Sequence, residues 1–256
     1  NNPYNGGSHL PDITVITPVF DAANHSILFY VASRAHHEDV GGIAPGSMSS
    51  LATDIHQEGI LLDSVKLVEQ GDFQVTRLET LFSSGAYPAR NIPQNMADLM
   101  AQTAANKTGV NELLKLVEQH SLKTVYAYMQ HIQDSAKTSV QKVIAGLEDG
   151  EFCYPLESGA SIVVKISIDK TKLRACIDFT GTSAQQNNNL NAPKAITQAA
   201  VMYVFRCLVN DDVPLNAGCM QALDIIVPEG SLLNPRFPAA VVAGNVETSQ
   251  AVTNAL

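Results

Sequence analysis

One short pattern, a histidine followed three residues later by an aspartate, occurs twice near the start of the chain. The two copies are His9 with Asp12 and His36 with Asp39, in a chain that has seven histidines altogether. Imidazole nitrogens and carboxylate oxygens are the usual protein ligands of zinc, manganese and iron, and an open catalytic site normally takes three or four of them. These four residues are therefore candidate ligands of one divalent metal ion.

A single copy of the pattern would favour a surface loop, because histidine, aspartate and glycine are common in loops. Two copies joined by a hairpin favour a metal site instead. Residues 13–20 and 27–33 are rich in β-branched and aromatic residues, and the turn-type stretch DAANHS separates them. The sequence therefore predicts two antiparallel strands that bring the two copies together at the open end of a hairpin.

The register of this hairpin decides which side chains meet. A turn centred near Asn24 would place Asp12 close to Arg34 and His9 close to His37. We expect the candidate ligands, Asp39 included, to converge within about 8 Å, which is the size of one metal site with its immediate surroundings. His25 in the turn, and His120 and His131 in helical stretches, are expected to be ordinary surface residues.

Two further stretches hold candidate catalytic groups. Glu58, directly before a glycine, could be a metal ligand, a general base or a partner that orients a histidine, and a solvated loop carboxylate is an equal alternative. In AGNVETSQ, an apolar strand AAVVAG would end at glycine and Asn245 would cap a helix, whose first amides could receive an anion or a carbonyl oxygen. Thr248 and Ser249 would add hydroxyl donors, although a routine helix start explains the same residues.

The remaining patterns predict an α+β fold with mixed, mainly antiparallel strands and a long central helical hairpin. Helical periodicity covers two stretches between Pro93 and Leu147, which would form a structural arm or a subunit contact. Further strands are expected at 60–68, 161–168, 173–179 and 222–227, and a further helix at 194–209. This gives a β-rich region with the paired motifs (1–92), the helical hairpin (93–148) and an α+β region (149–256).

Composition excludes several classes of protein. The net charge of −9 and the scattered basic residues argue against nucleic acid as a partner. No stretch approaches the roughly 20 continuous apolar residues of a membrane span. The four cysteines show no C-x-x-C spacing and are expected to be buried reduced thiols, which favours a cytoplasmic protein. The final stretch, ETSQAVTNAL, reads as a helix in progress, so we expect a fragment of a larger domain.

Nucleotide-binding motifs are also missing from the sequence. It contains no G-x-x-x-x-G-K-[ST], no G-x-G-x-x-G that opens a helix, and no G-x-S-x-G. Any chemistry that consumes ATP must therefore draw on a nucleotide site outside this chain.

Several long segments resemble the hydantoinase B/5-oxoprolinase family and occur in the order of that family. They are NNPYNGGSHLPDITVITPVF, SRAHHEDVGGIAPGSM, QEG, DFTGTS followed by NLNAPKAIT, and VVAGNVETSQ. The resemblance covers essentially the whole chain. The central helical stretch, with VYAYMQHIQDSA, is more similar to 5-oxoprolinases than to the acetone and acetophenone carboxylases of the same superfamily.

The resemblance implies one part of an ATP-dependent amidohydrolase that opens a small cyclic amide. A hydantoinase A-like subunit or domain would bind ATP and activate the substrate, and the B-type part would act on the activated species at a divalent metal ion (Zn, Mn or Fe). Carried over to this sequence, the metal ligands would be His9, Asp12 and His36, with Asp39 next. The protein would be a cytoplasmic oligomer, with a B-type region longer than this chain at both ends.

In this interpretation Glu58 or Asp39 would move the proton, and the helix start with Asn245 and Thr248 would receive the developing oxyanion or phosphate. Two alternatives stay open. The chain could be part of an ATP-dependent ketone carboxylase that uses the same ligands, or a non-catalytic interaction module in which the helical hairpin docks a partner. Metal content would separate the last alternative from the first two, and product analysis with bicarbonate would separate those two.

Overall fold

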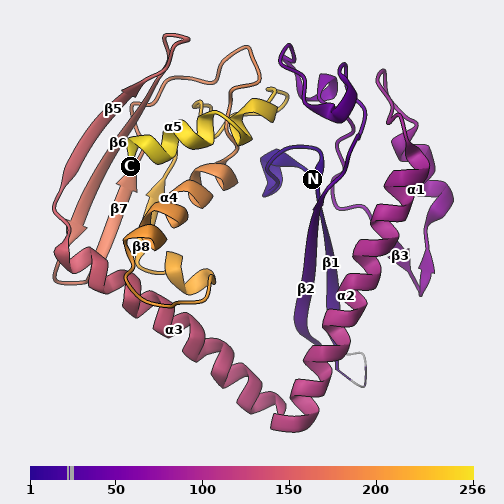
Figure 1. The fold of residues 1–256 in the computed structure, drawn as a ribbon, viewed down its shortest axis with the longest axis horizontal. Coiled ribbons are helices and arrows are strands. Elements are labelled where there is room, and N and C mark those ends of the chain that lie inside the picture. Colours follow the sequence, from indigo (N-terminus) through magenta and orange to yellow (C-terminus); the bar gives the residue numbers. More distant parts are fainter. Residues whose placement is uncertain (22, 24–25) are drawn as a thin grey trace.

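The fold is known from a computed structural model, which describes residues 1–21, 23 and 26–256. Two long helices form a V, and each arm of the V carries its own group of elements (Figure 1). The first group consists of η1 (Pro3–Asn5), β1 (Asp12–Phe20), β2 (Ile27–His36), η2 (Pro45–Ser47), η3 (Ile55–Gln57), β3 (Val68–Glu69), β4 (Asp72–Phe73) and α1 (Val75–Phe82). The long helices are α2 (Ile92–His120) and α3 (Leu122–Gly146). The second group consists of β5 (Gly150–Pro155), β6 (Ser161–Asp169), β7 (Arg174–Asp178), α4 (Lys194–Leu208), η4 (Ala217–Met220), β8 (Leu223–Ile226), η5 (Val242–Asn245) and α5 (Thr248–Ala255).

The predicted hairpin is confirmed, but its register differs from the expected one. β1 and β2 pair antiparallel with Asp12 opposite His36, so Asp12 does not face Arg34. The observed pairing is displaced by two residues from the expected one, and an irregularity between Val19 and Phe20, which adds one residue to β2, accounts for one of them. The expected turn centre at Asn24, and His25 beside it, lie outside the described residues.

One face of the hairpin is covered by α2. Residues at odd positions of β1, such as Ile13 and Val15, are buried against this helix. The amide nitrogen of the Gln102 side chain on α2 donates to the carbonyl oxygens of Ile13 at 2.9 Å and Ser33 at 3.2 Å. Because side chains alternate along a strand, residues at even positions, Asp12 among them, are turned to the opposite face.

The predicted helices of the central stretch are confirmed, whereas their close antiparallel packing is not. α2 and α3 diverge from Ser121 and spread apart along their length (Figure 1). Each helix packs on its own group of elements instead. On α3 the approach is tight, because a β-carbon added to Gly218 of η4 would lie 2.1 Å from the carbonyl oxygen of Gln133. The stretch 93–148 therefore links two packed groups.

The second group is built on a four-stranded sheet in the order β5-β6-β7-β8. The predicted strands at 161–168, 173–179 and 222–227 and the helix at 194–209 are confirmed. β7 and β8 are parallel, with α4 in the connection between them, and all other pairs in this sheet are antiparallel. The fold class is α+β, as predicted. Strand β5 and helix α1 were not expected from the sequence.

Two strand predictions are wrong. In 60–68 only Val68 lies in a strand, because the Asn1 side chain takes the place of a partner strand by accepting from the Leu62 amide at 2.7 Å and donating to the Ile60 carbonyl at 3.1 Å. The run AAVVAG ends in the short helix η5 rather than in a strand. Asn245 caps no helix, since α5 begins at Thr248 and follows Glu247.

Each group has its own hydrophobic core. The second core lies between the sheet and helices α3, α4 and α5, with Ile144, Ile177 and Phe179 fully buried. The first core lies around β1, α1 and α2, and it also contains Val241 from the far end of the chain. The segment 238–242 therefore crosses to the first group, where the Ile55 amide donates to the Pro238 carbonyl at 2.8 Å.

The cysteines are all free thiols, as expected, but not all of them are buried. Cys219 is buried and Cys176 half-buried, whereas Cys153 and Cys207 are exposed. Both exposed thiols lie on secondary structure whose other face carries the packing, so an apolar sequence context did not predict burial. Among the helices of the described chain, none has the length and apolar character needed to cross a membrane.

Candidate metal centre

The mouth of the β1–β2 hairpin brings three of the four expected ligands together. Asp12 opens β1 directly opposite His36, the last residue of β2. His9 lies one turn earlier, and its carbonyl accepts from the Asp12 amide at 3.1 Å, which folds the two side chains toward each other. The Asp12 carboxylate lies between the histidines, with Oδ1 3.0 Å from His36 Nδ1 and Oδ2 3.3 Å from His9 Nδ1.

This geometry suits a divalent metal ion. One ligand atom from each of His9, Asp12 and His36 can be chosen so that all three lie within 4.8 Å of one another. In a tetrahedral site with bond lengths of about 2.0–2.1 Å, neighbouring ligand atoms are about 3.3 Å apart. The separations of 3.0 and 3.3 Å, one from each Asp12 carboxylate oxygen, are hydrogen-bond distances that lie close to this spacing. Two imidazoles and a carboxylate suit zinc, manganese or iron and leave positions open for a substrate or water.

Neighbouring groups hold these side chains in place. The Ser8 hydroxyl, itself buried, donates to Asp12 Oδ2 at 2.9 Å. His9 is 2% exposed, and its burial lowers its pKa, although Asp12 acts in the opposite direction. His9 is thus neutral near pH 7, the form in which an imidazole binds metal. The His36 side chain is 52% exposed, so the group is open on that side.

Asp39, the fourth expected ligand, lies apart from this group. Its Oδ2 forms an ion pair with Arg90 Nη1 at 2.8 Å and accepts from the Gly46 amide, and its Oδ1 accepts from the amides of Gly41 and Arg90. Burial raises the pKa of Asp39, but the hydrogen bonds from these amides and from the guanidinium outweigh it and bring the pKa below its usual value. The group at ligand spacing therefore contains three of the four expected side chains, and Asp39 is instead paired with the Arg90 guanidinium.

The two glycines after Asp39 explain why its loop turns away from the hairpin. Gly41 and Gly42 have φ values of +91° and +93°, which favour glycine. A β-carbon on Gly41 would lie 2.2 Å from the Tyr87 carbonyl oxygen, and one on Gly42 would lie 2.7 Å from the backbone of Glu58. The glycines thus let the loop press against the segments before Arg90 and around Glu58.

Glu58 is a buried carboxylate with one free oxygen. It is 1% exposed, and its Oε1 accepts from the amides of Val241 and Val242, each at 2.8 Å. Its Oε2 has no hydrogen-bond partner among the described residues. Burial raises the pKa of Glu58 to about 7, although the two amide hydrogen bonds lower it in part. Glu58 is therefore neither a solvated loop carboxylate nor one of the metal-binding group.

The residues near the start of α5 are engaged in structural contacts. The Thr248 side chain is buried, and its hydroxyl donates to the Leu190 carbonyl. The amides of Val246 and Glu247, expected to be free, donate to the Ala243 carbonyl at 3.1 and 2.7 Å. Asn245 is half-buried, and its carbonyl accepts from the Ser249 hydroxyl at 3.0 Å. These hydroxyls and amides are therefore already engaged within the chain.

His37 is a buried histidine that the sequence did not single out. Its side chain is fully buried, with Nε2 3.1 Å from Gln102 Oε1 and Nδ1 3.4 Å from the side-chain nitrogen of Asn95. His37 Nδ1 also lies 3.9 Å from Asp98 Oδ2, so polar side chains of α2 surround the ring. Strand alternation was the available signal, because it places His37 on the face opposite to His36.

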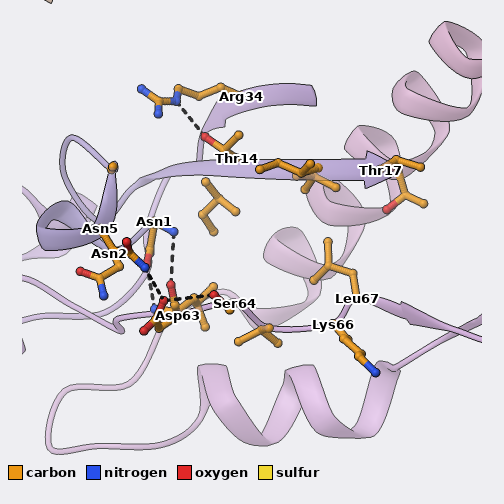
Figure 2. A pocket seen from close by; sticks show the side chains of 18 of the residues that line it. Asn1, Asn2, Asn5, Thr14, Thr17, Arg34, Asp63, Ser64, Lys66 and Leu67 are labelled. Atoms are coloured by element: carbon orange, nitrogen blue, oxygen red, sulfur yellow. Dashed lines mark hydrogen bonds between the residues drawn. The ribbon is translucent and has the colours of Figure 1, made fainter. Parts of the chain in front are cut away.

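A cavity of about 890 Å³ extends along β1 and the segment 62–68 (Figure 2). Thr14 and Arg34 lie on one side of it, and Asp63 and Lys66 lie on the other. The Arg34 Nε donates to Thr14 Oγ1 at 2.9 Å, which links the two strands two residue pairs beyond Asp12 and His36. An open space therefore begins beside the metal-binding group.

Comparisons with known proteins agree with this architecture. The sequence model of the family described as Hydantoinase B/oxoprolinase matches residues 1–256. The chain is 43% identical to 5-oxoprolinase 1 of Arabidopsis thaliana over 99% of its own length and 22% of that protein, and 43% identical to 5-oxoprolinase of Saccharomyces cerevisiae over 100% of its own length and 21% of that protein. The chain thus spans about a fifth of the length of these relatives.

Two solved structures share the fold. The ATP-dependent caprolactamase from Pseudomonas jessenii superimposes with a TM-score of 0.83 at 22% identity, over 100% of this chain and 44% of that one. A nucleotide-free acetone carboxylase superimposes with a TM-score of 0.80 at 17% identity, over 96% of this chain and 34% of that one. At these identities the likeness concerns the fold.

Proposed function

Because the chain belongs to the hydantoinase B/oxoprolinase family, we propose that it is part of an ATP-dependent hydrolase of cyclic amides, with a divalent metal site at His9, Asp12 and His36. The observation that carries the proposal is the convergence of these three side chains at ligand spacing. The names of relatives support the substrate class, since 5-oxoproline and caprolactam are both cyclic amides.

The chain's own residues would divide the work as follows. His9 and His36 each offer Nδ1, and Asp12 offers its carboxylate, while Ser8 fixes the orientation of that carboxylate. A divalent ion held there supplies Lewis-acid polarisation of a carbonyl or a lowered pKa of water. The exposed side of His36 leaves room for a cyclic amide to approach.

Proton transfer is assigned to Glu58 rather than to Asp39. A pKa of about 7 and an unpartnered oxygen are the properties of a group that exchanges protons near neutral pH. Asp39 lacks both, because Arg90 and three amides hold it as a carboxylate. Since Glu58 is buried, it would exchange protons with substrate only when the segment 238–242 moves away from it.

ATP would be bound by a hydantoinase A-like subunit or domain. The sequence of this chain contains no phosphate-binding loop, and the relatives are about five times longer than the chain. The protein would then act as an oligomer or a multidomain enzyme in the cytoplasm, with the chain receiving the activated cyclic amide from its partner.

Metal content tests the proposal most directly. The purified chain should bind about one manganese or zinc ion, measured by elemental analysis after dialysis, and the metal should be lost in Asp12→Ala. Combined with the A-like part and ATP, it should open 5-oxoproline. A chain that binds no metal would refute the metal site, and a carboxylated product formed with bicarbonate would favour the ketone carboxylase alternative that the acetone carboxylase fold raises.

A further inference from the structure

The cross-strand pair next to the metal-binding group is Thr14 with Arg34. The pair lies two positions along each strand from Asp12 and His36, so its side chains point to the same face at a spacing of about 7 Å. Arg34 is exposed, and its charge also acts to lower the pKa of His9. A fixed positive charge therefore stands beside the metal-binding group.

Arg34 differs from other arginines of the chain in its partner. Arg90, Arg174 and Arg236 form ion pairs with carboxylates. Arg34 instead uses Nε to bind a neutral hydroxyl, that of Thr14, and within the described residues its two terminal nitrogens have no hydrogen-bond partner. The guanidinium is thus held in a defined position with its outer edge free.

The outer edge of Arg34 lies at the rim of the 890 Å³ cavity. Figure 2 shows Arg34 reaching from β2 to Thr14 on β1 and extending past it. The other basic side chain in the cavity wall, Lys66, forms an ion pair with Glu69 at 2.8 Å. Asp63, on the opposite wall, is hydrogen-bonded to the hydroxyl of Ser64. Arg34 is therefore the cation available to a bound molecule at this end of the cavity.

We propose that Arg34, held by Thr14, binds an oxyanion of the molecule that reaches the metal centre. The proposal rests on the proposed function. A divalent ion with one aspartate ligand leaves one positive charge, to which Arg34 adds another, so the combined site favours an anion. The planar fork of a guanidinium matches a carboxylate or a phosphate, which carry the same two-oxygen edge.

Two sources could supply this oxyanion, the carboxylate of the cyclic amide itself or the phosphoryl group of an activated substrate. Three probes separate them. They are 5-oxoproline, 2-pyrrolidinone, which is the same ring without the carboxylate, and inorganic phosphate. Binding of each to the manganese-loaded chain is measured by titration calorimetry, with metal content determined in parallel.

We expect Arg34→Gln to weaken binding of 5-oxoproline, of phosphate or of both by at least about tenfold, because charge-assisted hydrogen bonds are lost. Binding of 2-pyrrolidinone and the metal content should not change. Arg34→Lys keeps the charge but loses the planar fork of the guanidinium, so its affinity for the anions should lie between that of wild type and that of Arg34→Gln. Thr14→Val frees the guanidinium and should weaken the same anions by a few fold. Arg77→Gln, an exposed arginine on α1, is the matched control and should bind as wild type.

The outcomes separate this inference from the proposed function. Loss of phosphate binding alone assigns the site to a phosphoryl group, and loss of the preference for 5-oxoproline over 2-pyrrolidinone assigns it to a carboxylate. Unchanged affinity of Arg34→Gln for both anions, or no anion binding by wild type, would overturn the inference while leaving the metal site intact. A wild-type chain without metal would refute the proposed function, and phosphate binding that still depends on Arg34 would then uphold the anion site alone.

Discussion

The two copies of H-x-x-D have the same spacing, but their aspartates have different partners in the folded chain. In the first copy a tight turn precedes β1 and folds His9 and Asp12 toward each other, 3.3 Å apart. In the second copy His36 is the last residue of β2, so the chain has already left the sheet when it reaches Asp39. Asp39 is paired with Arg90, whereas Asp12 has two imidazoles as neighbours.

The difference shows that spacing in sequence does not determine which side chains share a site. What decides is whether the residues lie before, within or after a strand, and whether a cation is already present. The partners of the Asp12 carboxylate are two imidazoles and a hydroxyl, whereas the Asp39 carboxylate is directly paired with a guanidinium. The first arrangement can accept a metal ion, and the second stabilises a loop.

The largest expected effect comes from removing Asp12. Structural zinc sites with four ligands bind with roughly 10–16 kcal/mol, so one ligand accounts for about 3–4 kcal/mol. Asp12→Ala, and likewise His36→Ala, should therefore lower metal affinity by more than about a hundredfold, measured by titration with manganese or zinc. His131→Ala, an exposed histidine on α3, should bind metal as wild type does. If a folded Asp12→Ala variant still bound a stoichiometric amount of metal, the first copy of the motif would only stabilise its loop, as the second copy does.

A third carboxylate, Glu58, has neither a histidine nor a cation beside it, and this sharpens the contrast. Its pKa is raised to about 7 in the folded chain, so the folded state prefers the protonated form. Its contribution to stability is then fully present below about pH 4.5 and is lost as the pH rises through about 7, a change of roughly 3 kcal/mol. Urea unfolding at pH 5 and pH 8 should show this loss in wild type.

Glu58→Gln removes the titrating group and keeps an oxygen for the two amides. The difference in unfolding free energy between wild type and Glu58→Gln should therefore shift by roughly 3 kcal/mol between pH 4.5 and pH 8, in favour of the variant at high pH. Contributions from other titrating groups cancel in this difference. A difference that does not vary with pH would show that Glu58 titrates normally.

Replacing Asp39 tests the other half of the comparison. Asp39→Asn should lower the unfolding free energy by about 2 kcal/mol at pH 7, because Arg90 loses its partner and charged hydrogen bonds become neutral ones. Since the pKa of Asp39 is below its usual value, the stabilisation is present at neutral pH and is lost as the pH falls below about 4. Metal affinity should be unchanged, and a large loss of metal would return Asp39 to the ligand set.

The smallest effect is expected at Ser8, which supports Asp12 without being a ligand. Ser8→Ala removes a hydrogen bond of 2.9 Å to Asp12 Oδ2, a change of about 1 kcal/mol. Metal affinity should fall by about tenfold, in the range known for groups that orient metal ligands. Ser49→Ala, a buried serine in the loop after η2, offers a comparison for the loss of a hydroxyl elsewhere. Equal metal affinity for Ser8→Ala and wild type would mean that Asp12 needs no support.

Local patterns in the sequence were sufficient for most helices and most strands, but they did not predict α1 and β5. Periodicity identified α2, α3 and α4, and β-branched runs identified β1, β2, β6, β7 and β8. Failures occurred where a distant residue replaced a regular partner. The Asn1 side chain bonds the backbone of residues 60 and 62, and Glu58 accepts from the amides of Val241 and Val242. These backbone groups therefore have no partner strand, although the sequence around them predicts strands.

The candidate site was likewise predictable only where local patterns place its residues, and not where a residue distant in sequence is the partner. Residues in or next to β1 and β2 could be placed together, because strand pairing fixes their relation. Arg90 lies 51 residues from Asp39, and no local sequence pattern predicts that the two side chains will pair. The one-residue irregularity beside Phe20 also has no local signal in the sequence, and it accounts for one of the two positions by which the partner of Asp12 moved from Arg34 to His36.

The crossing of segment 238–242 into the first core has a consequence for the order in which the molecule forms. Val241 completes a core whose other members come from the first hundred residues, and Glu58 bonds to a residue 183 positions later. During synthesis, which proceeds from the N-terminus, the amides that Glu58 binds are not yet made when the rest of its surroundings have emerged from the ribosome. Until residues 238–242 have been made, the first group therefore has a gap in its apolar core and a Glu58 carboxylate without its two amide donors. Contacts of such long sequence separation slow folding, because a large loop must close before they form. A nascent chain halted at residue 230 should accordingly be cut by protease within residues 1–92, and one extended to residue 256 should resist.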